Sequence, residues 1–136
     1  MTYEETIDFI EAICVDINPN GSFIHGRKMD GSLSYPDPMP QIHLYPFITV
    51  PDFLNGFDKS NMVMGFWMQG SAEASPDESK VLIGQADTLV RTFLARLHAS
   101  SVSIESIQME PAYNIFPAVL TGYSLVFQLI SKTTSC

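Results

Sequence analysis

The sequence has little positive charge, only two cysteines and no long hydrophobic run. Seven Lys and Arg stand against fifteen Asp and Glu, which gives a net charge of −8. A field of that sign repels phosphate backbones and disfavours nucleic-acid binding. No run approaches the roughly 18 to 20 apolar residues that span a bilayer, and the acidic start M-T-Y-E-E-T is unlike a secretory signal. These features predict a chain made and folded in a cytoplasm, with no membrane partner.

Signatures of chemistry are also missing. Cys14 falls on the apolar side of an expected helix, where a free cysteine is typically a small buried side chain, and Cys136 is the last residue. His25, His43 and His98 lie far apart and have no partner at metal-ligand spacing. The sequence contains no nucleophile elbow, phosphate loop or dinucleotide fingerprint. We therefore expect no cofactor, no metal and no enzymatic activity; an enzyme with a dispersed site is a weaker alternative.

The composition is that of a folded domain with an apolar surplus. Hydrophobic residues make up 46% and charged residues 16% of the 136 positions, whereas disordered chains are poor in large apolar residues. The length suits one domain with a real core. Nine Phe and seven Met predict a subunit that buries part of its surface against neighbours.

Two helices are predicted from their start signals. Thr2 and Glu5 have the spacing of a capping box, and the helix they begin must stop near the turn signal at residues 18–21. Ser75 followed by Pro76 and Glu78 combines an N-cap, a proline at the first helical position and a capping glutamate. An apolar stripe follows it as far as Leu97 and predicts a long helix that covers one sheet face.

Strands are expected from alternating or β-rich segments, with Pro46 requiring that one of them be at an edge, bulged or broken. The segments are Gln41 to Val50, Met62 to Gln69, Ile104 to Glu110 and Tyr123 to Leu129. Ser22 to Arg27 is either an edge strand or an extended connection. The order predicts an α+β fold, in which two helices pack on a mostly antiparallel or mixed sheet of four to five strands that ends in a long C-terminal β-hairpin. Residues 1–136 are expected to form a single domain.

Irregular segments supply the candidate contacts. Proline and glycine predict extended loops at residues 28–40 and 51–61, and the chain is expected to fray at 131–136. The first loop is a candidate arm toward a neighbouring subunit, and the apolar tip at residues 112–121 is the best candidate for an assembly contact. The candidate contact residues are Tyr35, Met39, Tyr113, Ile115, Phe116, Val119 and Leu120.

The last third of the chain carries a family resemblance. The run E-P-A-Y-N at Glu110 to Asn114, followed by L-T-G-Y-S-L-V-F-Q-L at Leu120 to Leu129, resembles the C-terminal hairpin of tail-terminator or tail-completion proteins of tailed bacteriophages. The order of elements agrees over most of the chain. The resemblance implies a virion structural protein that forms a homo-oligomeric ring, commonly a hexamer, and joins the tail tube to the head-tail connector. DNA would pass through such a ring without specific binding.

One alternative from another class stays open. The Met and Phe content also suits a small cytoplasmic binding module with an apolar pocket between helix and sheet.

Overall fold

The computed structural model describes residues 1–26, 39–70, 75–115 and 120–133. Its elements form an α+β fold with a mixed six-stranded sheet, which confirms the predicted fold class. In chain order they are α1 (Tyr3–Ile17), β1 (Ser22–His25), β2 (Gln41–Leu44), β3 (Ile48–Asp52), β4 (Phe57–Gln69), α2 (Pro76–His98), β5 (Ser103–Ile115) and β6 (Leu120–Lys132).

Both helices begin where their capping residues predict. The Thr2 hydroxyl accepts a hydrogen bond from the Glu5 backbone N–H at 3.2 Å, and the Glu5 carboxylate accepts one from the Thr2 N–H at 2.9 Å. The Ser75 hydroxyl caps α2 by accepting from the Glu78 N–H at 3.2 Å. These bonds satisfy backbone donors that the first helical turn leaves without partners. Neither helix in the described ranges has the length and apolar character needed to cross a bilayer.

The sheet has the order β1-β2-β4-β6-β5, and β3 pairs with β4 beyond the end of β2. β1 and β2 are parallel, and the other neighbouring strands are antiparallel. β4 pairs with β6 from Phe57 to Gln69, as expected for a central strand. Because β4 and β5 both run antiparallel to β6, they are parallel to each other and α2 crosses between them.

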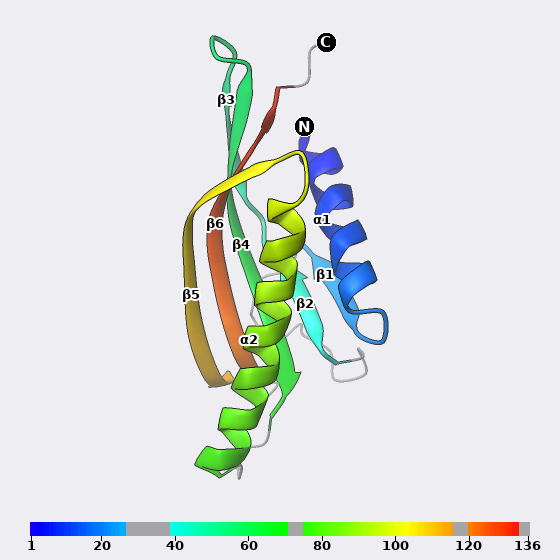
Figure 1. Ribbon diagram of the computed structural model, residues 1–136, viewed down its shortest axis with the longest axis vertical. Helices are drawn as coiled ribbons and strands as arrows, with labels where there is room; N and C mark the ends of the chain where they lie inside the picture. Colours follow the sequence, from blue (N-terminus) through cyan, green and yellow to red (C-terminus); the bar gives the residue numbers. More distant parts are fainter. Residues whose placement is uncertain (27–38, 71–74, 116–119, 134–136) are drawn as a thin grey trace.

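Both helices lie on one face of the sheet (Figure 1). The core between the layers centres on three aromatic rings: Phe93 of α2 lies 5.5 Å from Phe66 of β4 and 6.1 Å from Phe127 of β6 between ring centroids. All three side chains are fully buried. Burial of each such side chain contributes roughly 1.5–3 kcal/mol, so this contact holds helix and sheet together.

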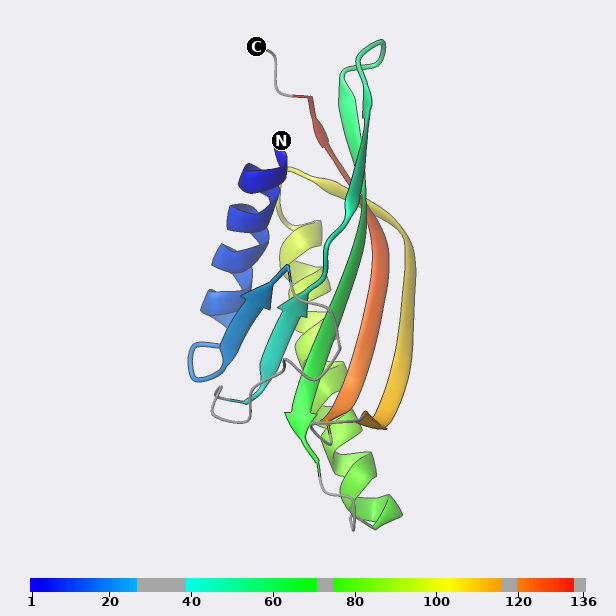
Figure 2. The same cartoon turned by 180° about the vertical axis from the view of Figure 1, so that it is seen from behind.

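The other sheet face, called here the open face, has neither helix on it (Figure 2). Alternation along β4 assigns its residues to the two faces. Met62 and Met64 are fully buried under the helices, whereas Lys59 and Asn61 are exposed on the open face and Val63 is half-buried there. Along this face burial increases away from the β3–β4 end, and His43 and Trp67 are buried, so the exposed part of the face lies toward β3.

The middle of the chain has more strands than expected. The segment Gln41 to Val50 is broken at Pro46, one of the three outcomes expected for that proline, and forms two strands, β2 and β3. Residues 51–61, expected to be an irregular loop, instead form the end of β3, a tight turn and the start of β4. The sheet consequently has six strands and not four to five.

The expected fraying from residue 131 is also wrong for the described residues. Ser131 is buried and paired with Asp58, and β6 continues to Lys132. The Thr133 N–H then donates to the Gly56 carbonyl at 2.9 Å. These bonds tie the end of β6 to the turn between β3 and β4.

Candidate functional site

Exposed apolar side chains concentrate on the hairpin formed by β3 and β4, which extends beyond β1 and β2 and carries its turn at one end of the sheet (Figure 1). Leu54 is 95% exposed and Phe53 is 78% exposed, both in the turn. Ile48, Val50 and Phe57 are also exposed, and their register places them on the open face. Large apolar side chains gathered in this way mark interaction sites more often than scattered ones do.

The turn that carries Phe53 and Leu54 is held by its own hydrogen bonds. The Asp52 carboxylate accepts from the Asn55 backbone N–H at 3.1 Å and from the Asn55 side-chain amide at 2.8 Å. These two bonds lower the pKa of Asp52 below its ordinary value. Gly56 has a positive φ of 77° and donates to the Asp52 carbonyl at 2.8 Å, a backbone conformation that glycine adopts without steric cost. The two apolar side chains therefore project from an ordered turn.

Polar side chains anchor the hairpin along its helix-facing side. Asp58 is buried and pairs with the Met1 amine at 3.2 Å, and it also accepts from the Thr133 hydroxyl at 3.2 Å. The Thr49 and Ser60 hydroxyls are hydrogen-bonded to each other at 2.8 Å. Buried polar groups are stable where they have such partners. The hairpin is thus a fixed projection of the sheet.

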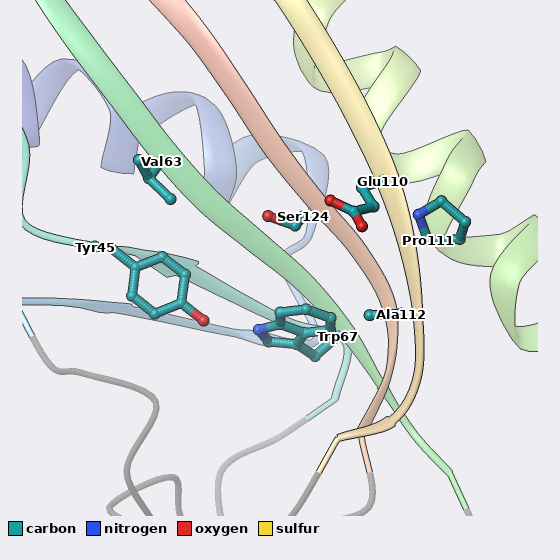
Figure 3. A pocket seen from close by; sticks show the side chains of 7 residues that line it. All are labelled: Tyr45, Val63, Trp67, Glu110, Pro111, Ala112 and Ser124. Carbon is teal, nitrogen blue, oxygen red and sulfur yellow. The ribbon is translucent and has the colours of Figure 1, made fainter.

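A shallow groove of about 380 Å³ lies on the open face at the opposite end of β4 (Figure 3). Strands β4, β5 and β6 and the connection between β2 and β3 supply its walls. The lining residues are Tyr45, Val63, Trp67, Glu110, Pro111, Ala112 and Ser124. The groove is mainly apolar and carries one carboxylate. It lies on the open face and not between helix and sheet, where the binding-module alternative expected a pocket.

One wall of the groove is a pair of aromatic side chains whose polar atoms face each other (Figure 3). Burial raises the pKa of Tyr45, and the neighbouring Trp67 indole, a hydrogen-bond donor, partly offsets that rise. The Trp67 ring lies over Gly65, where a side chain would occupy the space of the indole. His43 stacks on Tyr45 with ring centroids 4.1 Å apart and is fully buried, so this wall is backed by packed rings.

The structure describes few of the candidate contacts chosen from the sequence. Met39 is half-buried and packs against Trp67 and Leu120. Leu120 is fully buried in that small cluster, so in the folded chain its side chain is internal and not presented to a partner. The register explains this, because Leu120 pairs with Gln69 and lies on the same face as Trp67.

The other candidates fall wholly or partly outside the described residues. Tyr113 and Ile115 belong to β5, but the description does not extend to their side chains. The expected loop at 28–40 is described only from residue 39 onward. The candidates that lie in undescribed segments are Tyr35, Phe116 and Val119.

The hairpin tip was missed from the sequence, although a signal for it was present. Asn55-Gly56 is a strong short-range hairpin signal where it lies between two strand-forming segments, but the proline and glycine of residues 51–61 predict an irregular loop. Cys14 lies where predicted, buried in the core with the pKa of its thiol raised by burial. Within the described ranges, no three His, Cys, Asp or Glu side chains gather in a way that could hold a metal ion.

Comparison of the sequence with protein-family models and with curated proteins finds no match.

Proposed function

We propose that this chain is a structural subunit of a tailed-phage virion, a tail-terminator or tail-completion protein that forms a ring between the tail tube and the head-tail connector. The observation that carries the proposal is the projecting β3–β4 hairpin, with Phe53 and Leu54 exposed at its tip, beside a sheet face that neither helix covers. A chain that acts by assembly needs apolar surface of this kind. The proposal assigns it no enzymatic activity.

The remaining properties suit that role. A net charge of −8 would keep DNA from adhering as it passes through a ring, since like charges repel at short range. The resemblance of Glu110 to Asn114 and of Leu120 to Leu129 to the family's C-terminal hairpin agrees with the paired β5 and β6. The protein would act in the neck of the virion after synthesis in the host cytoplasm.

Co-assembly with the tail-tube protein of the same phage tests the proposal. Tubes polymerised with this chain should carry a ring at one end in negative-stain images and should stop elongating. Tubes that grow without limit, with the chain left free in solution, would count against the role.

A matched pair of variants sharpens the experiment. The double change Phe53→Ser and Leu54→Ser should abolish capping while the fold persists. Val81→Ser changes an equally apolar residue that is 59% exposed on α2, away from the sheet, and should leave capping intact. Equal loss in both variants would mean that general surface hydrophobicity, and not the hairpin, drives the binding.

The groove favours the second candidate, a binding module for a small apolar ligand, because its volume of about 380 Å³ falls within the range of ligand sites. Isothermal titration with a panel of aromatic and aliphatic ligands decides it. Stoichiometric binding that is lost on Ala112→Arg, which would fill the groove, and kept in the Phe53→Ser and Leu54→Ser variant would favour the module. Absence of binding across the panel would remove it.

A further inference from the structure

The hairpin tip and the groove have matching chemistry but cannot meet within one chain. The tip offers an exposed phenyl and an exposed isobutyl group, and the groove offers an apolar floor walled by Trp67 and Pro111 (Figure 3). They lie at opposite ends of β4, from Phe57 to Trp67. At about 3.3 Å of rise per residue, these ends are roughly 30 Å apart. Any contact between the two surfaces therefore joins different copies.

Charges on the open face also differ between the hairpin end and the groove end. Lys132 pairs with Phe57 next to the turn of the hairpin, and in the described part of the chain it takes no part in an ion pair. Lys59 lies nearby, in an exposed pair with Glu105 at 3.9 Å. The groove has Glu110 on its wall and no basic residue. In a chain with a net charge of −8, bringing the lysine end of one copy to the Glu110 end of another reduces the repulsion between them.

We propose that the hairpin tip of one copy docks in the open-face groove of the next, with Phe53 and Leu54 in the groove and Lys132 facing Glu110. The contact joins two different patches and is heterologous, so successive copies form a ring where the rotation closes. The inference rests on the proposed function in one respect, that copies of this chain assemble with each other. It adds which surfaces meet and in which direction.

Mixing two half-defective variants tests the contact directly. The tip variant carries Phe53→Ser and Leu54→Ser and keeps an intact groove. The groove variant carries Ala112→Arg and keeps an intact tip. Each alone should self-associate at least roughly 30-fold more weakly than the natural chain, as expected on losing a buried apolar anchor. Their mixture should give a one-to-one dimer that grows no further, measured by sedimentation velocity with circular dichroism as the check on folding.

The alternatives give different results in the same experiment. Two variants that both stay monomeric when mixed would overturn the contact, because each still has the surface that the other lacks. Larger oligomers formed by the tip variant alone would overturn it too.

Disulfide trapping provides a second measurement that does not depend on affinity. The variant with Leu54→Cys, Ala112→Cys and Cys136→Ser should give a ladder of linked chains on mild oxidation. Cys14 is buried and its thiol pKa is raised, so it does not compete for oxidation. The matched control replaces Leu54→Cys with Val81→Cys on α2 and should remain a monomer. Absence of the ladder, or an equal ladder in the control, would contradict the docking.

Failure of the contact is distinguishable from failure of the proposed function. Rings on tail tubes that form equally well with the tip variant and the groove variant would remove the contact and leave the function. Trapped ladders from a chain that never caps tail tubes would support the contact and remove the function. A natural chain that stays monomeric, together with no ladder from the Leu54→Cys and Ala112→Cys variant, would overturn the docking.

Discussion

Phe93 lies at the centre of the contact between α2 and the sheet, and its truncation tests the packing on which the rest of the molecule depends. The ring is fully buried between Phe66 and Phe127. Phe93→Ala removes the buried ring and leaves a cavity, which costs about 3–5 kcal/mol. Because small domains are stable by only about 5–15 kcal/mol, the expected loss is a large share of the total.

Urea unfolding followed by circular dichroism measures this loss, with the linear dependence on denaturant giving the free energy of unfolding. For a chain of this length the same loss lowers the melting temperature by roughly 10–17 °C. Val81→Ala on the same helix is the matched control, since Val81 is 59% exposed and should change the free energy by less than about 0.5 kcal/mol.

The result that refutes the reasoning is a cost below about 1 kcal/mol for Phe93→Ala at an unchanged dependence on urea. If Phe93→Ala fails to fold, Phe93→Leu keeps most of the volume and should cost about 1–2 kcal/mol. A Phe93→Leu protein as stable as the natural chain would then contradict the packing.

Three further predictions concern local structure. Thr2→Ala removes the α1 cap and should lower the free energy of unfolding by about 1 kcal/mol, measured by urea unfolding. Gly122→Ala should lower the free energy of unfolding by more than about 2 kcal/mol, because the added methyl group would overlap the Phe66 backbone carbonyl. The control Gly84→Ala adds a methyl group that meets no other atom and should raise the free energy of unfolding by about 0.5–1 kcal/mol. Equal effects of the two changes would contradict the close approach of β4 and β6. Asp52 has a lowered pKa in the folded chain, so the folded state binds its proton less readily than the unfolded state, and its contribution to stability is present above about pH 4 and lost as the pH falls through the folded value. A carboxyl NMR titration should show that lowered pKa and its return toward the ordinary value in Asn55→Ala.

Much of the fold follows from local signals in the sequence. The Thr2 and Ser75 caps place both helix starts because each cap involves only residues three apart in the chain. The alternation from Tyr123 to Leu129 identifies β6 in the same way. These features need no knowledge of distant residues, which is why sequence reasoning finds them.

The β3–β4 hairpin is not predicted from the sequence because its inward residues depend on distant partners. Asp58 and Ser60 occupy inward positions of β4, so the segment lacks the apolar alternation of a half-buried strand. Their partners are the Met1 amine and the Thr49 hydroxyl, and the first of these is brought close only by the completed fold. A strand with polar residues at its inward positions is predicted as a loop from sequence, because the distant partners of those residues are not known.

In the candidate site, too, local sequence predicts some features, and others depend on strand pairing. Apolar density around residues 112–121 predicts a contact region, and Ala112 lines the groove, but such density does not distinguish internal from exposed positions. Leu120 is internal because its register with Gln69 places it beside Trp67, and register is a property of strand pairing that a single segment does not encode.

The pairing of β4 with β6 also has a consequence for how fast the molecule can form. These two strands make the longest ladder of the sheet, yet the whole of α2 and β5 separates them in the chain. Closing so long a segment has an entropic cost that must be met before the ladder forms. We therefore expect the local β5–β6 hairpin to form early and β4 to join it in the rate-limiting step. Refolding should then be slow for a chain of this size, and Val63→Ala in β4 should mainly slow folding, because a contact made in the rate-limiting step changes the folding rate.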